Sequence, residues 1–93
     1  MAILIDTARW PAHGRLWAHL ISDDNLDELH AVAAAHDLPR RGLDRDHYGV
    51  PGAVVERLIS AGARHVTARE LVNALRDSGL RITARERREN PGH

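Results

Sequence analysis

The stretch Leu-Trp-Ala-His-Leu-Ile-Ser-Asp-Asp-Asn, residues 16–25, joins a strand pattern directly to a helix start. Among its first six residues, Trp17, His19 and Ile21 occupy alternate positions, which predicts a β-strand with two distinct faces. Its last four residues are all of the kinds that commonly cap helices. Apolar residues then recur at spacings of three and four, so we expect a helix over residues 25–36.

The segments on either side of this stretch carry weaker signals. Residues 2–5, Ala-Ile-Leu-Ile, form a short apolar run that is typical of a buried strand. Residues 7–15 contain Pro11 and Gly14, which favour a loop. Residues 40–49 have a mixed character, and we expect a short strand followed by a loop.

The second half of the chain contains two more helix patterns. Pro51 suits the first turn of one helix, and Gly62 marks the end of that helix. A very short strand is expected at His65. Thr67 and Glu70 then form a capping box, which predicts the start of a third helix.

Gly79, followed by an apolar residue, predicts the end of the third helix. Residues 81–83 are expected to add an edge strand, and residues 84–93 to form a disordered charged tail. Strands alternate with helices in this order, which is typical of an α/β fold. We therefore expect a single α/β domain over residues 1–83, with a small, mostly parallel sheet covered by three helices.

The composition excludes several classes of protein. The 93 residues include no Cys, so disulfides and thiolate metal sites are excluded. The first residues do not resemble a signal peptide, and no apolar run approaches the ~20 residues that span a bilayer. We expect a cytoplasmic protein with no membrane partner. The formal net charge is zero, so no overall attraction to nucleic acid is indicated.

Imidazole and carboxylate groups gather in the first half of the chain, which holds five of the seven His residues. Together these groups suit Zn or Mn. We expect a divalent metal to be held by five residues: Asp6, His19, Asp23, His30 and His47. In the alternative interpretation, His30 is a half-buried helix residue and His47 is a surface loop residue.

The predicted loop over residues 7–15 also indicates an anion site. Arg9, His13, Gly14 and Arg15 could present guanidinium groups and backbone amides to a phosphate. The sequence lacks the Gly-x-x-x-x-Gly-Lys signature of nucleoside triphosphate binding. In the alternative interpretation the loop is ordinary, and its Arg side chains pair with nearby Asp residues.

His47 and Tyr48 are the candidate catalytic residues, because imidazole exchanges protons readily near neutral pH. They lie beside Asp44 and Asp46, and in the alternative interpretation this polar segment is a solvated turn. Trp10 and Trp17 could stack on a base or nucleotide. The alternative is that one of them fills the core and the other covers the loop.

Several ordered motifs between residues 3 and 80 resemble one known family. They read Arg-Trp-Pro-Ala-His-Gly-Arg-Leu-Trp-Ala-His-Leu-Ile-Ser-Asp, Leu-Asp-Glu-Leu-His, Asp-His-Tyr-Gly-Val-Pro and Ala-Gly-Ala. Together they resemble domain of unknown function 4031, a small bacterial and phage family. The family pattern reads His-Tyr-Asp where this chain has Gly49 after Tyr48, so no ligand or base is expected at position 49. The resemblance implies a fold grouping and no particular activity.

These features support two hypotheses about function. The first is a metal-assisted phosphoester hydrolase that acts on a nucleotide or nucleic acid, with metal-bound water as the nucleophile. The second is a non-catalytic module whose Arg-containing loop binds an anion or a partner protein. A chain of this size has no room for a deep enclosed cavity, so the site would be either a shallow cleft or shared between the two copies of a homodimer.

Overall fold

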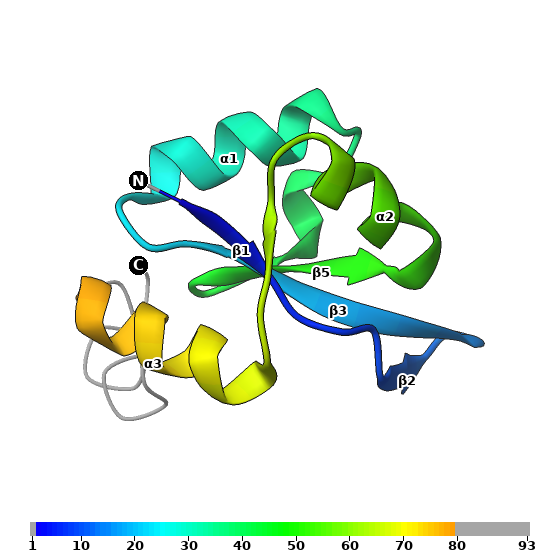
Figure 1. The fold of residues 1–93 in the computed structure, drawn as a ribbon. Coiled ribbons are helices and arrows are strands. Elements are labelled where there is room, and N and C mark those ends of the chain that lie inside the picture. Colours follow the sequence, from blue (N-terminus) through cyan, green and yellow to red (C-terminus); the bar gives the residue numbers. More distant parts are fainter. Residues whose placement is uncertain (1, 80–93) are drawn as a thin grey trace.

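The central strand is β3 (Arg15–Ser22), which confirms the strand predicted from alternating side chains. The computed structural model describes residues 2–79. In it, β3 pairs antiparallel with β5 (His47–Pro51) on one side and with β1 (Ile3–Ile5) on the other. These three strands cross the middle of the molecule (Figure 1). Their pairing fixes which side chains share each face of the sheet.

Three short strands complete the sheet. β2 (Trp10–Ala12) pairs antiparallel with the start of β3, and β4 (Leu43–Asp44) pairs antiparallel with β5. β6 (Arg64–His65) is the one strand of the described chain that pairs in parallel, and its partner is β1. The sheet has six strands in the order β4-β5-β3-β1-β6, with β2 attached to β3. The expected mostly parallel α/β sheet is therefore wrong: the fold is α+β, with a mixed and mostly antiparallel sheet.

Two tight turns explain this correction. His13 and Gly14 join β2 to β3 and both have positive φ, 51° and 78°, as required by hairpin turns that match the twist of antiparallel strands. The predicted loop over residues 7–15 thus contains β2. Arg45 and Asp46 join β4 to β5 in the same two-residue manner. Each turn reverses the chain, so the strands that it joins run antiparallel.

Residues 40–49 also differ from the expectation of a short strand and a loop. Arg40–Gly42 form a 3₁₀ turn, η1, which leads into β4. The expected loop contains the β4–β5 turn and the first residues of β5, which is a central strand.

The helices lie close to where the sequence predicts them. α1 (Leu26–Ala35) begins at Asn25, whose side-chain oxygen accepts the backbone N–H of Glu28 at 2.7 Å. α2 (Gly52–Ser60) follows β5 without a loop, and Pro51 is its N-cap residue. The expected helix at residues 25–36 is confirmed.

The third helix, α3 (Ala68–Ser78), has the capping box that the sequence predicts. The Thr67 hydroxyl accepts the backbone N–H of Glu70, and the Glu70 carboxylate accepts the backbone N–H of Thr67. The helix ends at Gly79, which has a left-handed conformation with φ of 81°. The predicted start and end of this helix are both confirmed.

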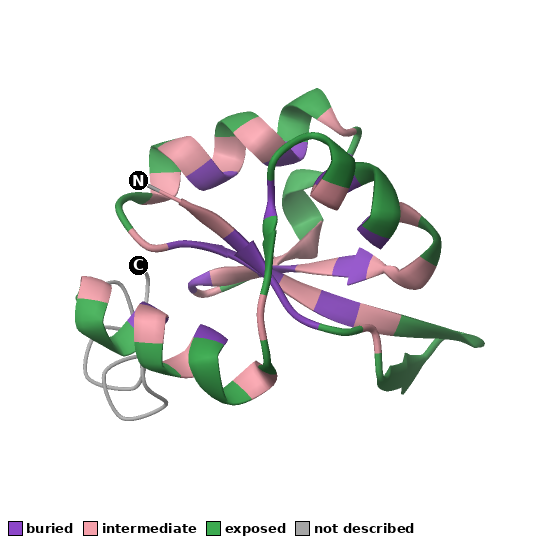
Figure 2. Ribbon diagram, in the orientation of Figure 1, coloured by how far each residue is buried: buried purple, intermediate pink, exposed green. Residues whose placement is uncertain are grey.

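The helices are divided between the two faces of the sheet (Figure 1). α1 and α2 pack on one face and form the larger core, which includes Leu20, Tyr48 and Val50 from the strands. α3 packs on the opposite face, where its buried residues Leu71 and Leu75 contact Leu4 and Ile21. Figure 2 shows the buried residues concentrated along the middle strands and on the inner sides of the helices.

Within residues 2–79, α3 packs on only one part of its face of the sheet. It covers Leu4 and Ile21. Two residues further along the same face lie Asp6, directly after β1, and His19 on β3. These polar groups lie beyond the small core under α3, so a site can form there without disturbing the larger core.

No helix within residues 2–79 is long and apolar enough to span a membrane. The expected edge strand at residues 81–83 and the expected tail at residues 84–93 lie outside the described residues.

Candidate functional site

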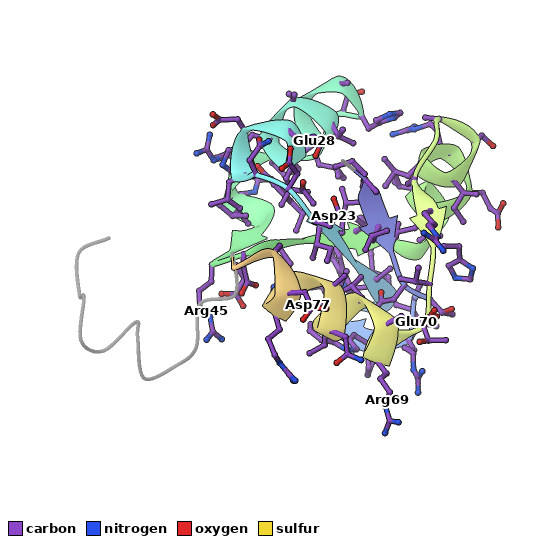
Figure 3. All side chains as sticks on the ribbon, turned by 60° about the vertical axis from the view of Figure 1, so that its left-hand side comes forward. Asp23, Glu28, Arg45, Arg69, Glu70 and Asp77 are labelled. Carbon is purple, nitrogen blue, oxygen red and sulfur yellow. The ribbon has the colours of Figure 1, made fainter. Side chains whose placement is uncertain are left out.

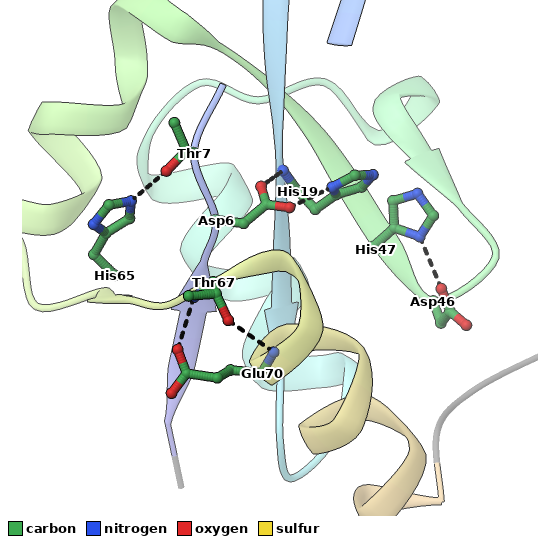
Figure 4. A network of polar contacts seen from close by, with 8 residues as sticks. All are labelled: Asp6, Thr7, His19, Asp46, His47, His65, Thr67 and Glu70. Atoms are coloured by element: carbon green, nitrogen blue, oxygen red, sulfur yellow. Dashed lines mark hydrogen bonds and ion pairs between the residues drawn. The ribbon is translucent and has the colours of Figure 1, made fainter. Parts of the chain in front are cut away.

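The pairing of β1 with β3 places Asp6 directly beside His19. Asp6 Oδ1 accepts the backbone N–H of His19 at 2.6 Å, and Asp6 Oδ2 lies 2.7 Å from His19 Nδ1 (Figure 4). The backbone N–H of Asp6 in turn donates to the His19 carbonyl oxygen at 3.2 Å. Asp6 is only 2% exposed. This buried carboxylate therefore fixes the position of the His19 imidazole.

A second carboxylate holds a second imidazole at the start of β5. His47 Nδ1 lies 2.8 Å from Asp46 Oδ1, and Asp46 is 4% exposed. The backbone N–H of Asp46 donates to the carbonyl oxygen of Asp44 at 2.8 Å, and Arg45 between them has a φ of 62°. Such a tight turn around a non-glycine residue is strained. It directs the Asp46 carboxylate toward the imidazole that follows.

The two imidazoles face each other across β3 and β5. Their ring centroids are 5.0 Å apart and their planes are inclined by 70°. The strand register pairs His19 with Gly49, so His47 is the diagonal neighbour of His19 on the same face. Their side chains are 15% and 18% exposed, respectively. We call His19 and His47 the histidine pair.

Both rings are held through Nδ1 by a carboxylate, which determines the nitrogen of each ring that carries the proton. An ionised carboxylate only accepts hydrogen bonds, so Nδ1 of each ring carries the proton that it donates. Nε2 is then the nitrogen left for chemistry. Among residues 2–79, Nε2 of neither His19 nor His47 has a hydrogen-bond partner. Each Nε2 can therefore exchange a proton or bind an electron-poor atom.

An exposed aromatic surface adjoins the histidine pair. Trp10 is 50% exposed, and its ring centroid lies 3.6 Å from that of His19 and 6.4 Å from that of His47, edge-on to both. Trp17 pairs with Trp10 across the hairpin, and its Nε1–H donates to the carbonyl oxygen of Ala12 at 2.9 Å. The hairpin thus carries two indole rings to the edge of the site.

The four predicted phosphate ligands lie in and beside this hairpin. Arg9, His13, Gly14 and Arg15 are all exposed. The guanidinium carbon of Arg15 lies 6.0 Å from the Trp17 ring centroid, at the limit of a cation–π contact. Strand alternation places Arg15, Trp17 and His19 on one face of the sheet. Phosphate binding by this group stays a prediction.

Three other predicted site residues lie apart from the histidine pair. Asp23 accepts the backbone N–H of Ala2 at 2.7 Å, in the turn that precedes α1 (Figure 3). His30 on α1 has Nδ1 2.8 Å from the Tyr48 hydroxyl. Tyr48 is 1% exposed and packs in the larger core, on the opposite face from its neighbour His47. This geometry gives these three residues structural contacts and no access to the site.

The predicted metal ligands do not form one group. Within the part of the chain that the structure describes, no cluster of three or more His, Asp or Glu side chains could hold a metal ion. Asp6 and Asp46 are engaged with the imidazole Nδ1 atoms. The two Nε2 atoms are therefore the ring nitrogens that remain to bind a metal ion. Zinc sites in proteins usually have three or four protein ligands. Binding of Zn or Mn stays a prediction.

The sequence alone does not assign roles to two residues that shape the site. It indicates Asp46 only as a neighbour of His47, and Trp10 only as one of two stacking candidates. The available signal was the adjacency of Asp46 and His47, because an Asp in a turn commonly hydrogen-bonds to a group close in sequence. For Trp10 the signal was the His13-Gly14 turn, which pairs it with β3.

Fold and site together define a small α+β protein with two carboxylate-bound imidazoles on one face of a mixed sheet. A family model described as "Protein of unknown function (DUF4031)" matches residues 3–78. The chain belongs to this family, which confirms the resemblance of its motifs. No curated protein and no solved structure matches the chain.

Proposed function

We propose that this protein cleaves a phosphoester in a nucleotide or nucleic acid, by acid–base catalysis at the histidine pair. The supporting observation is the pair itself: two partly exposed imidazoles 5.0 Å apart, each bound through Nδ1 by a buried carboxylate. Cleavage of a phosphoester needs one proton removed from the attacking oxygen and one delivered to the leaving oxygen. Two imidazoles at this separation suit the two tasks around one phosphoryl group.

The carboxylates have a positioning role in this proposal. Asp6 and Asp46 keep the proton on Nδ1, so that Nε2 points toward the substrate. They also stabilise the positive charge of an imidazole that has accepted a proton. General acid–base groups of this kind typically accelerate a reaction by about 10²- to 10⁴-fold.

The hairpin supplies the binding groups. Arg15 shares the sheet face of His19, and its guanidinium group can form paired hydrogen bonds with phosphate oxygens. Arg9 lies next to Trp10, and its backbone N–H donates to the carbonyl oxygen of Trp17 at 3.0 Å, which ties it to β3. The positive charge of these arginines would offset the negative charge of a phosphate that binds close to the two carboxylates.

The test measures hydrolysis of bis(4-nitrophenyl) phosphate with EDTA present. His19→Ala and His47→Ala should each lower the rate by at least about 100-fold. His65→Ala is the matched control, because His65 is an exposed histidine whose Nε2 lies 3.0 Å from the Thr7 hydroxyl, away from the pair. It should retain the wild-type rate. A wild-type protein without activity, or histidine-pair variants with full activity, would contradict the proposal.

A metal-assisted route is the second candidate. Metal-bound histidines usually donate their other ring N–H to a carboxylate, as both imidazoles of this pair do. In this case Zn or Mn would activate a water molecule as the nucleophile. Activity that EDTA removes and Zn or Mn restores would favour this route, whereas activity unchanged by EDTA would favour acid–base catalysis.

The non-catalytic alternative uses the same surface. An anion- or protein-binding module would bind phosphate through Arg9 and Arg15 without any turnover, and isothermal titration with inorganic phosphate would detect it. A cytoplasmic location and a homodimer are also proposals. Sedimentation analysis of the purified protein would show whether it is a dimer.

A further inference from the structure

We infer that the substrate of the histidine pair is single-stranded RNA, cleaved by attack of its own 2′-hydroxyl group. This inference rests on the proposed function and adds the substrate class and the nucleophile. It is supported by three features: the exposed ring of Trp10, the arrangement of residues along β3, and the engagement of the nearby hydroxyl groups.

The Trp10 indole is placed to stack on a base beside the scissile phosphate. Half of this residue is exposed, although its ring lies edge-on to both imidazoles. Proteins that bind single strands stack unpaired bases on such aromatic rings. A base within a duplex is already stacked on its neighbours, so the arrangement favours a single strand.

The surface formed by Trp10 and the histidine pair extends along one face of β3 toward Arg15. Arg15, Trp17 and His19 occupy alternate positions, with Trp10 paired to Trp17 across the hairpin. A base can therefore lie on an indole while the Arg15 guanidinium group reaches the sugar–phosphate backbone. The order of arginine, indole and imidazole along one strand matches a chain of alternating phosphates and bases.

The hydroxyl groups nearest to the site in the sequence are engaged elsewhere. The Thr7 hydroxyl lies 3.0 Å from His65 Nε2, and the Ser22 hydroxyl donates to Glu28 Oε2 at 2.6 Å. The Tyr48 hydroxyl lies 2.8 Å from His30 Nδ1, in the larger core. None of the three faces the histidine pair. Two imidazoles with available Nε2 atoms can move protons but supply no attacking oxygen, so this oxygen comes from water or from the substrate, and we assign it to the substrate. RNA has such an oxygen in its 2′-hydroxyl, adjacent to the phosphorus atom.

The reaction then balances with two proton transfers. Nε2 of one imidazole removes the proton of the 2′-hydroxyl, and the 2′ oxygen forms a bond to phosphorus. The bond between phosphorus and the 5′ oxygen breaks, and this oxygen takes the proton of the other imidazole, which is protonated at the start. The products are a 2′,3′-cyclic phosphate and a free 5′-hydroxyl, and no oxidant or reductant is consumed.

The experiment compares three oligonucleotides of one sequence with EDTA present: RNA, DNA and 2′-O-methyl RNA. We expect cleavage of the RNA alone, with cyclic phosphate and 5′-hydroxyl ends identified by mass spectrometry. The double variant His19→Ala/His47→Ala, purified in parallel, should lose this activity. Circular dichroism of each variant verifies that it is folded.

Trp10→Ala tests the stacking step. It should lower kcat/KM on RNA by about 5- to 150-fold, the loss expected for one base–aromatic stack. Leu16→Ala is the matched control, because Leu16 is equally exposed at 50% on the same hairpin but on the opposite face. It should retain the wild-type kcat/KM. An equal loss in both variants would overturn the role of Trp10.

The remaining outcomes separate this inference from the proposed function. Equal cleavage of DNA and RNA, with an oxygen atom from ¹⁸O-labelled water in the first product, would overturn the 2′-hydroxyl mechanism and leave the phosphoesterase intact. Absence of cleavage of all three oligonucleotides, with activity on bis(4-nitrophenyl) phosphate, would overturn RNA as the substrate. Absence of activity on every substrate would overturn both.

Discussion

The two faces of β3 differ sharply although their residues alternate along one strand. Ala18 and Leu20 point toward α1 and α2 and are completely buried. Trp17 and His19, each adjacent to one of them in sequence, lie on the other face and remain partly exposed. The larger core thus keeps the strand in place while the opposite face is free to carry polar groups. Stability and chemistry are divided between the two faces of one element.

The histidines show the same division. His30 hydrogen-bonds to the Tyr48 hydroxyl, a neutral group that belongs to the larger core. His19 and His47 are bound by buried carboxylates and are paired with each other. A neutral partner ties a helix to the sheet, whereas a charged partner fixes the proton on one nitrogen. The partner of each imidazole therefore distinguishes a structural histidine from a candidate catalytic one.

The largest effect is expected from Asp6→Asn, which keeps the shape of the side chain and removes its charge. Asn can donate a hydrogen bond to His19 Nδ1, and this favours the tautomer with the proton on Nε2. A carboxylate-to-amide change of this kind disables a neighbouring imidazole, so kcat on bis(4-nitrophenyl) phosphate should fall by about 10²- to 10⁴-fold. An unchanged kcat would show that Asp6 has no positioning role.

A large loss of stability is expected on the other face. Leu20→Ala removes a completely buried side chain from the larger core and should lower the free energy of unfolding by about 2–5 kcal/mol. Leu16→Ala, at a half-exposed position of the same strand, should change it by only about 0.5 kcal/mol. Urea denaturation measures both values. Equal losses would contradict the division between the two faces.

Tyr48→Phe tests whether the Tyr48 hydroxyl has a structural or a chemical role. Loss of its hydrogen bond to His30 should lower the free energy of unfolding by about 1 kcal/mol, measured by urea denaturation. Because Tyr48 is buried on the opposite face from the histidine pair, we expect kcat to be unchanged. A large decrease in kcat would instead support the catalytic role predicted from the sequence.

A similar or smaller effect is expected at the start of α3, the helix that packs on the second face. Thr67→Ala removes the hydroxyl that accepts the Glu70 backbone N–H and should lower stability by about 1 kcal/mol. For a domain of this size, this corresponds to roughly 4–8 °C in Tm. Calorimetry checks the value, and an unchanged Tm would mean that the capping box does not stabilise the helix.

The smallest effect concerns the decrease in Tm as the pH becomes acidic. The backbone N–H of Thr67, followed by the Thr67 side chain and the charge of Arg64, holds the pKa of Glu70 below its ordinary value. A carboxyl whose pKa is lower in the folded state stabilises the fold above its unfolded pKa, and this contribution disappears as the pH falls through the folded pKa. Glu70→Gln should therefore reduce the decrease in Tm between neutral and acidic pH. An identical decrease would contradict this assignment.

Local signals in the sequence were sufficient for the helices and for β3. The caps at Asn25 and Thr67 and the stop at Gly79 act within one turn of backbone, so their residue types alone identify them. β3 is long, and its burial alternates over residues 17–20. Such features need no knowledge of distant parts of the chain.

The pairing of the sheet could not be predicted in the same way. All residues of β2, Trp10–Ala12, are exposed, so this strand has no alternating apolar pattern. In β5 only Tyr48 and Val50 are buried. The residues beside them include Gly49 and His47, which are not typical of strands, so the sequence does not indicate a strand here. The antiparallel direction depends on two turns with residues at positive φ, and one of these residues is Arg45, which rarely adopts that conformation.

The candidate site was predicted in part. The sequence placed Asp6, His19 and His47 in one site, and the structure brings these three close together. His47 was expected in a loop, whereas it begins β5, and the antiparallel pairing of β3 with β5 places the two imidazoles side by side. The engagement of both carboxylates by imidazole depends on distances that spacing in the sequence does not contain.

Carboxylates orient His19 and His47 through Nδ1, and we expect each Nε2 to be accessible to a ligand. Long-range ¹H–¹⁵N correlation spectra of the labelled protein test it directly, at mildly alkaline pH where imidazole is ordinarily neutral. We expect both residues to carry the proton on Nδ1, and their Nε2 signals to shift on addition of inorganic phosphate, while those of His30 do not. A proton on Nε2 of both residues, or a phosphate response confined to other histidines, would contradict the account.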